Sequence, residues 1–371
     1  MDRLNNQHKA INPQMVSVAR EARGIPQETL ADALKVTQGR VSKMEAGLLP
    51  IPSDLVDALA RILHYPPHFF YQDGPLLGPG IPEFYHRKRQ SVPKKLLEMI
   101  YAQMNIRRLQ VTALLRGVDI PCTVPRIDPE EYAGDIEEVA RLMRASLYLP
   151  AGPIRDVTTT LEDAGVLLLP FDFGTNQIDA ISQWVPHLPP LVFINAGSLK
   201  DRYRFSLAHE LGHMVLHAAP NPDIEKQANR FAAEFLVPAR EARADLRDLT
   251  LEKLARLKPY WKVSMAMLLQ RATDLGTVTA NQARYLWAQM TKAGYKTREP
   301  VDLDIDGEQP RLFHELIETY LQQLSYTPSD LGTLVSLCDD EFRATYLQRR
   351  RASPLRVMPA PYTLTRDTRN A

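Results

Sequence analysis

The sequence predicts a mainly α-helical protein of several domains, with one small α+β region near its centre. At roughly 100–200 residues per domain, 371 residues are enough for two or three domains. Apolar residues recur at helical spacing, as at Leu55, Leu59 and Ile62. The chain holds 29 prolines and 17 glycines, where shares of about 5% and 7% are usual. That balance is typical of helices joined by stiff connections.

The composition excludes several classes of protein. The chain is 44% hydrophobic and 24% charged, which indicates a globular rather than a disordered protein. Lys and Arg number 45 against 44 Asp and Glu, so any contact with nucleic acid must come from a local patch. Two cysteines, Cys122 and Cys338, exclude a disulfide framework. Since no apolar run approaches 18 residues and Met1–Ala10 is polar, we expect a cytoplasmic protein without a membrane segment.

Changes in composition divide the chain into five segments. The run from Gly74 to Pro82 breaks any helix and separates the first domain from the rest of the chain. Basic and proline residues after Arg349 indicate a loosely ordered tail. The predicted segments are a helical domain at 11–71, a linker at 72–82, a helical connecting region at 83–149, an α+β domain at 150–245, and a helical C-terminal region with the tail at 246–371.

Three short apolar runs in the fourth segment predict a small three-stranded sheet. Each run is bounded by turn residues, and the runs cover 166–170, 178–185 and 191–194. Two strongly helical stretches come next, over 198–217 and 223–235. This region is therefore expected to be α+β.

The first of these helices carries the motif His209-Glu210-x-x-His213. Residues four apart on an α-helix lie about 40° apart around the axis, so the two imidazoles can share one Zn²⁺. Glu210 would lie beside the open metal position, where it can take a proton from zinc-bound water and return it to a leaving amine. Gly212 costs the helix about 1 kcal/mol relative to Ala, which suggests close approach by a strand or a substrate.

Zinc needs a third protein ligand, and the sequence offers three. His217 lies a further turn along the same helix, but three imidazoles in one row surround a tetrahedral ion poorly. Glu225 on the next helix is favoured, and Glu234 is the third choice, with a role in an ion pair as its alternative. Asn229, one turn after Glu225, is predicted to hydrogen-bond a ligand histidine.

Residues 202–213 together with 225–238 resemble the ImmA/IrrE family of zinc metallopeptidases. The resemblance implies a zincin-like domain in which His209, His213 and Glu225 hold one Zn²⁺ and Glu210 is the base. It also implies a protein substrate, because members of this family cut specific repressors that control mobile elements or stress responses. One departure is Val237, where methionine is usual.

The N-terminal segment has the pattern of a helix-turn-helix. Leu30 and Leu34 would pack one helix, a turn passes through 35–36, and Thr37 can cap a second helix whose Val41 and Met44 face inward. Polar side chains then face outward to meet base edges and phosphates. The predicted DNA-binding residues are Gln27, Thr37, Gln38, Arg40, Ser42 and Lys43. A helical bundle with an ordinary polar face is the alternative interpretation.

Residues 11–71 resemble the Cro/C1-type (XRE) helix-turn-helix family, which implies a five-helix domain that binds DNA. Three departures are Pro26 in place of a hydroxyl cap, Gly39 in the recognition helix, and the apolar turn at 48–50. Residues 1–75 carry eight basic and eight acidic side chains, so docking onto another helix-turn-helix protein is an alternative to DNA binding.

Together these features predict a DNA-binding regulator that carries a zinc-dependent endopeptidase for a repressor or another partner protein. The alternative is a transcriptional regulator or antitoxin-like protein whose zinc domain is structural or sensory. A homodimer is one option for the assembly. The cluster His86–Arg89 is a weaker candidate for contact with the DNA backbone.

Overall fold

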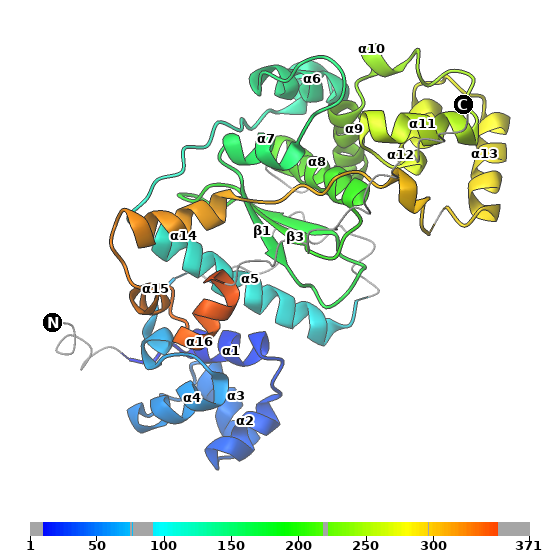
Figure 1. Ribbon diagram of the computed structural model, residues 1–371. Coiled ribbons are helices and arrows are strands. Elements are labelled where there is room, and N and C mark those ends of the chain that lie inside the picture. Colours follow the sequence, from blue (N-terminus) through cyan, green and yellow to red (C-terminus); the bar gives the residue numbers. More distant parts are fainter. Residues whose placement is uncertain (1–9, 75, 77–91, 218–221, 296, 348–371) are drawn as a thin grey trace, which may run out of the picture.

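The computed structural model describes residues 10–74, 76, 92–217, 222–295 and 297–347 (Figure 1). Within these residues the protein is mainly helical and has one three-stranded sheet, which confirms the predicted fold class. The cluster His86–Arg89, the tail after Arg349 and most of the predicted linker lie outside the described residues. No described helix combines the length and the apolar character that crossing a membrane requires.

The N-terminal domain is built from short helices. They are α1 (Pro13–Ala22), α2 (Gln27–Leu34), α3 (Gln38–Glu45) and α4 (Val56–Leu63), with 3₁₀ turns η1 (Ser53–Leu55) and η2 (Pro67–Tyr71). The Thr37 hydroxyl accepts from Arg40 N at 3.3 Å, so it caps α3. Pro26 begins α2 without a side-chain cap.

A long helix, α5 (Lys94–Leu114), joins this domain to the sheet. Ala102 and Ile106 lie in the hydrophobic core of the N-terminal domain. Ile100 and Met104 belong instead to the core against the sheet. Because α5 buries apolar side chains on more than one side, it lies between the two parts of the molecule (Figure 1).

The sheet has the order β1-β3-β2, from β1 (Leu167–Phe171), β2 (Ala180–Gln183) and β3 (Leu191–Asn195). β1 pairs with β3 in parallel and β2 pairs with β3 antiparallel. Alternate side chains of the strands face opposite sides of the sheet. Leu167 and Leu169 pack in the core that contains α5, whereas Leu168 packs with the helices of the other face.

That other face is covered by helices that continue into the C-terminal half. They are α6 (Ile136–Ser146), α7 (Val157–Asp163), α8 (Lys200–Leu216), α9 (Ile224–Leu236), α10 (Ala239–Ala242), α11 (Leu251–Trp261), α12 (Met265–Asp274) and α13 (Ala280–Lys292). Two short 3₁₀ turns flank this group: η5 (Pro129–Tyr132) precedes α6, and η6 (Val301–Leu303) follows α13. Their apolar faces form one large core with β1 and β3.

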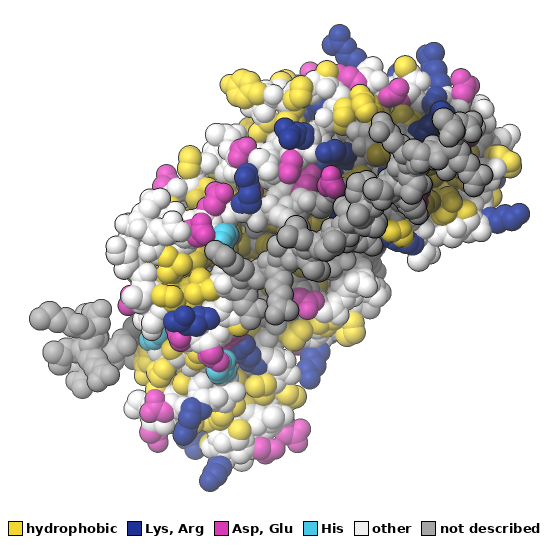
Figure 2. Space-filling model, in the orientation of Figure 1, with side chains coloured by type: hydrophobic (Ala, Val, Ile, Leu, Met, Phe, Trp, Pro, Cys, Tyr) yellow, Lys and Arg dark blue, Asp and Glu magenta, His cyan; other side chains and the backbone are white. Residues whose placement is uncertain are grey.

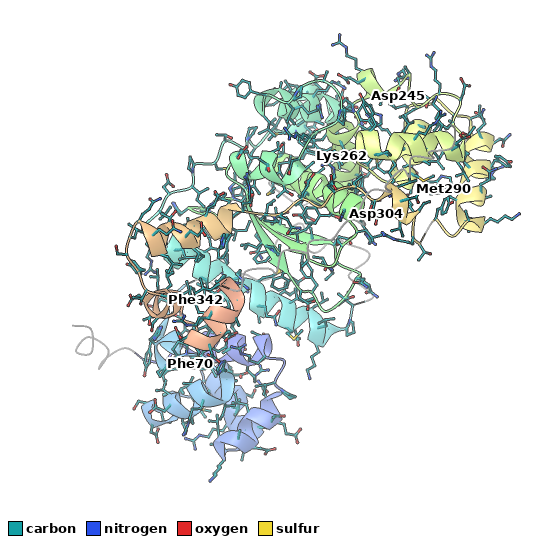
Figure 3. The ribbon with its side chains drawn as sticks, in the orientation of Figure 1. Phe70, Asp245, Lys262, Met290, Asp304 and Phe342 are labelled. Atoms are coloured by element: carbon teal, nitrogen blue, oxygen red, sulfur yellow. The ribbon has the colours of Figure 1, made fainter. Side chains whose placement is uncertain are left out.

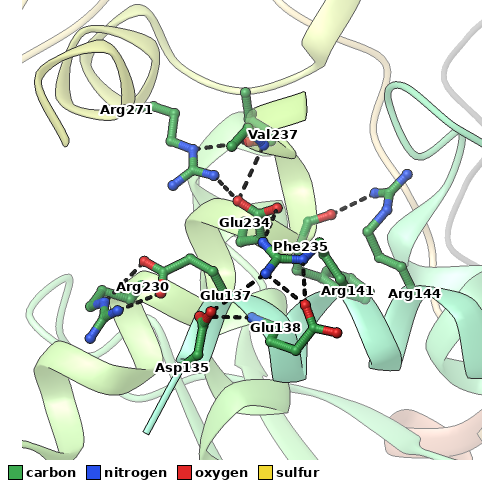
Figure 4. Close-up of polar contacts among 11 residues, drawn as sticks. Asp135, Glu137, Glu138, Arg141, Arg144, Arg230, Glu234, Phe235, Val237 and Arg271 are labelled. Carbon is green, nitrogen blue, oxygen red and sulfur yellow. Dashed lines mark hydrogen bonds and ion pairs between the residues drawn. The ribbon is translucent and has the colours of Figure 1, made fainter. Parts of the chain in front are cut away.

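A buried ion-pair network holds the end of α9 (Figure 4). The Glu234 carboxylate is 1% exposed and pairs with Arg271 of α12 and, at 3.3 Å, with Arg141 of α6. The Arg271 guanidinium also donates to Val237 O at 3.0 Å, and Arg144 donates to Phe235 O at 2.6 Å. Breaking one partner of such a buried pair is costly, so this network fixes α9 against α6 and α12.

The last described helices pack against the N-terminal domain. They are α14 (Leu312–Gln322), α15 (Pro328–Leu334), α16 (Asp339–Phe342) and the π-helical turn η7 (Arg343–Leu347). Phe342 shares a core with Phe70 of η2, and the two side chains lie at the same junction in Figure 3. The region after residue 246 therefore serves two cores, since α11–α13 pack on the central helices.

Gly165, in the turn between α7 and β1, has a φ of +83°. A Cβ atom there would lie 2.2 Å from Pro121 O. We expect Gly165→Ala to destabilise the protein by about 2–4 kcal/mol, because the cost of a left-handed conformation for alanine adds to the cost of the clash between its Cβ and the Pro121 backbone. Denaturant unfolding measures this change.

Gly276→Ala is the matched control, because Gly276 has a φ of +65° and open space around its Cα. This variant should cost only about 1 kcal/mol. Equal losses of stability in the two variants would contradict the role assigned to the contact with Pro121.

Candidate metal centre

Helices α8 and α9 bring three metal-ligating side chains together. The Nε2 atoms of His209 and His213 lie 3.0 Å apart. Glu225, in the first turn of α9, has one carboxylate oxygen 3.6 Å from His209 Nε2 and the other 3.4 Å from His213 Nε2. The three side chains form one compact group of potential ligands.

The spacing of these atoms fits a tetrahedral ion. With bonds of about 2.0–2.1 Å from Zn²⁺ to nitrogen or oxygen, donor atoms at tetrahedral corners lie roughly 3.3–3.4 Å apart. The distances of 3.0, 3.4 and 3.6 Å bracket that value. Two imidazoles and one carboxylate are also a donor set that Zn²⁺ accepts, with a fourth corner left open.

The outer nitrogens of both imidazoles have partners. His209 Nδ1 lies 3.1 Å from Asn229 Oδ1. His213 Nδ1 lies 3.1 Å from His217 Nδ1, and His217 Nε2 lies 2.9 Å from Gln227 Oε1. With protons on the outer nitrogens of His209 and His213, each Nε2 lone pair faces the centre of the group.

His217 lies behind His213 rather than in the group of three. Burial, followed by the charge of His213, lowers the pKa of His217 to about 4. A neutral imidazole can accept a hydrogen bond at Nδ1 from the Nδ1–H of His213 and donate one from Nε2–H to Gln227 Oε1. His217 thus contacts Nδ1 of His213 and orients the His213 ring. The spacing of four residues already places the rings of His213 and His217 next to each other, whereas the contact with Gln227 comes from the neighbouring helix α9.

The two ligand histidines differ in proton affinity. Burial lowers the pKa of His209, but hydrogen bonding and charge from Glu225, with the charge of Glu210, outweigh burial and raise it. Burial dominates at His213 and lowers its pKa. The carboxylates of Glu225 and Glu210 therefore favour positive charge at His209, whereas burial favours the neutral imidazole at His213.

Glu210 projects from α8 toward the sheet and is buried. Its Oε2 atom accepts from Ser182 N at 2.8 Å and from Ser182 Oγ at 2.6 Å. Ser182 lies on β2, which forms an edge of the described sheet. Sequence reasoning did not single out Ser182, because the pairing joins residues 28 positions apart across two elements.

Gly212 marks the closest approach of α9 to α8. A Cβ at this position would lie 3.3 Å from Ala228 Cα and 3.1 Å from a ring atom of Phe231. The expectation that a strand or a substrate approaches Gly212 is therefore wrong: the neighbour is the helix that carries Glu225. The missing side chain lets the two helices pack closely enough for the ligand atoms to meet.

The remaining candidates lie elsewhere. Glu234 is in the ion-pair network of α9, not in the ligand group. Arg204, one of the residues of the family-like motif, is buried near the start of α8 and pairs with Glu308. Burial lowers the pKa of Arg204 to about 10, and its guanidinium also donates to Ile154 O at 2.7 Å. Arg204 therefore anchors the metal-site helix.

The predicted DNA-binding residues fall into two groups. Thr37, Gln38, Arg40 and Lys43 are exposed on α3, and Ser42 is half-buried there. Gln27 is half-buried, donates to Glu45 at 2.7 Å and accepts from Gln38 at 2.7 Å. On the face seen in Figure 2, basic and acidic side chains are interspersed over the N-terminal end, so no single basic patch dominates that view.

Two parts of the chain match known protein families. Residues 18–70 match the helix-turn-helix family, and residues 161–273 match the family described as the IrrE N-terminal-like domain, a peptidase family. No curated protein and no solved structure matches the chain. The chain thus joins an XRE-type helix-turn-helix domain to an ImmA/IrrE-like domain that contains α8, α9 and the sheet.

Proposed function

We propose that this protein is a DNA-binding regulator whose central domain is a zinc-dependent endopeptidase acting on a specific partner protein, a repressor. One observation carries the proposal: His209, His213 and Glu225 form one group of potential metal ligands, and a buried carboxylate, Glu210, is the next residue after His209. The resemblance to repressor-cleaving peptidases supports the class of substrate. The helix-turn-helix in the same chain supports a role for the protein as a regulator bound to DNA.

The number of proposed protein ligands, three, favours a catalytic zinc site over a structural one. Structural zinc sites have four protein ligands, whereas catalytic sites have three and keep one position open. Two histidines and one carboxylate are the protein ligands proposed here, with Asn229 and His217 as orienting partners. When bound, one Zn²⁺ supplies Lewis-acid activation of water and of the scissile carbonyl.

The chain's own residues would handle the proton. Glu210 accepts the proton of the attacking water and delivers it to the amine that leaves. Ser182 holds one oxygen of that carboxylate through two hydrogen bonds, which fixes its direction beside the ligand histidines. Asn229 and His217 keep the rings of His209 and His213 in the tautomer that metal binding needs.

DNA binding is assigned to α3. Arg40 and Lys43 are its exposed cations, suited to base edges and phosphates, and Gln38 lies with them. Gln27 and Gln38 hydrogen-bond each other, so the first turns of α2 and α3 would meet DNA as one unit. Thr37 and Ser42 supply hydroxyls on the same short helix or its cap.

We expect His209→Ala to lose the one equivalent of zinc that this centre would hold, because one of its three proposed ligands is lost. Asn229→Ala should weaken zinc binding about 10–100-fold by freeing the His209 ring. Native mass spectrometry and competition with a chelator measure both effects. Lys226→Ala, an exposed change on α9, is the control and should bind zinc normally. Unchanged zinc content in His209→Ala would refute the ligand assignment.

Glu210→Gln should keep zinc and lose cleavage, with a fall in rate of about 10²–10⁴-fold when the proton acceptor is removed. Sequencing of new protein N-termini in cells expressing wild type or Glu210→Gln would reveal the substrate. Glu131→Gln, an exposed change, is the matched control and should cleave normally. Equal cleavage by wild type and Glu210→Gln would leave the structural or sensory role of the zinc domain as the better account.

Replacing both Arg40 and Lys43 by Ala should weaken DNA binding and flatten its salt dependence. Each lost phosphate contact lowers the slope of log K against log salt by roughly 0.9. A titration of DNA at several salt concentrations measures this slope. Arg61→Ala, an exposed cation on α4, is the control for charge alone. No retention of DNA by wild type at low salt would favour docking onto another helix-turn-helix protein.

A further inference from the structure

A second group of metal-ligating side chains lies where the C-terminal helices meet the helix-turn-helix domain. It consists of His64, at the end of α4, with Cys338 and Asp340, at the start of α16. Each offers one ligand atom within 4.8 Å of the others, and His64 Nε2 lies 3.2 Å from Asp340 Oδ2. We propose that these three residues form a second transition-metal site, which clasps the C-terminal segment onto the helix-turn-helix domain.

Both chain segments are held in place by one side chain, Arg23 of α1. Its guanidinium donates to Leu63 O at 2.9 Å and to His64 O at 2.8 Å. The same guanidinium pairs in a bidentate manner with Glu341, at 2.8 and 2.6 Å. Arg23 also lies over the Tyr65 ring, 4.3 Å from its centroid. The backbones that carry His64 and Cys338 are therefore fixed relative to each other without a metal.

The acidic residues around the group differ in their partners. Asp339 is paired with Arg343 at 2.8 Å, and Glu341 is paired with Arg23. Asp340 contacts only His64 among the ion pairs of the described residues, and its side chain is 72% exposed. A cation at this position would therefore take the Asp340 carboxylate without breaking a buried pair.

The donor set selects the kind of metal. A thiolate and an imidazole suit Zn²⁺ and Co²⁺ rather than Mg²⁺ or Ca²⁺, which take oxygen ligands. Binding exchanges the Cys338 thiol proton for the metal and releases that proton to solvent. The side chains of His64 and Asp340 are half or more exposed, so small rotations bring the three donors from their present spacing to bonding distance. Water can occupy the remaining position.

A metal here would join residues 274 positions apart in the sequence. It would add a cross-link to the core in which Phe342 of α16 packs with Phe70 of η2. Because such an ion binds only the folded arrangement, it would stabilise the contact between the C-terminal helices and the DNA-binding domain. This second site is independent of peptidase activity, since it uses none of the ligands proposed for the zinc centre.

Cobalt distinguishes the two sites, because only the second contains sulfur. We expect the full chain to show a near-ultraviolet thiolate-to-cobalt absorption when titrated with Co²⁺. His209→Ala should retain this absorption, and Cys338→Ser should lose it. Cys122→Ser is the matched control, since the other free cysteine is outside the group, and it should retain the absorption. No absorption in wild type, or its survival in Cys338→Ser, would overturn the proposal.

A second measurement begins with the unmodified protein. Zn²⁺ should slow alkylation of Cys338 at least tenfold, while alkylation of Cys122 in the same sample stays unchanged. The metal effect should disappear in His64→Ala, which keeps the thiol. Equal alkylation rates at Cys338 with and without Zn²⁺ would overturn the proposal. Loss of zinc from His209→Ala with this protection intact would show that the two sites are separate.

Discussion

The close packing of α8 on α9 is the constraint on which the proposed metal centre depends. Two histidines one turn apart on α8 would supply only two ligands, and the third would come from the first turn of α9. Gly212 faces Ala228 and Phe231, so the helix backbones approach without an intervening side chain. Glu225 then lies within 3.6 Å of both imidazoles. A helix pair separated by one more methyl group would move the carboxylate away from the imidazoles.

The rest of the central domain holds this helix pair from both sides. The sheet supports α8 through the apolar core and through Ser182, whose backbone and hydroxyl hold Glu210. The Glu234 network holds the far end of α9, about two and a half turns from the proposed ligand Glu225. Arg204 and Glu308 fix the start of α8 and tie it to the segment that leads into α14. The ligand atoms are therefore placed by four separate sets of contacts.

Local patterns predicted the elements of this site, and tertiary contacts supplied its detail. Apolar runs located the three strands, and helical spacing located α8 and α9, because each element buries one recognisable face. The lack of a single apolar face hid the role of α5, which is buried against two cores. The pair between Arg23 and Glu341 joins residues 318 positions apart, so no local pattern contains it. For the same reason the contact of Glu210 with Ser182 became visible only in the fold.

The charge of the DNA-binding domain shows why a count of residues is a poor guide to its surface. Glu45 lies on α3 beside the proposed DNA contacts, where a free carboxylate would repel phosphate. Its side chain is only 5% exposed, because Arg20 of α1 binds it at 2.6 Å and Gln27 donates to it. Arg20 and Glu45 therefore cancel each other inside the domain. What α3 presents outward is Arg40 and Lys43, so its exposed face is basic although the domain as a whole is neutral.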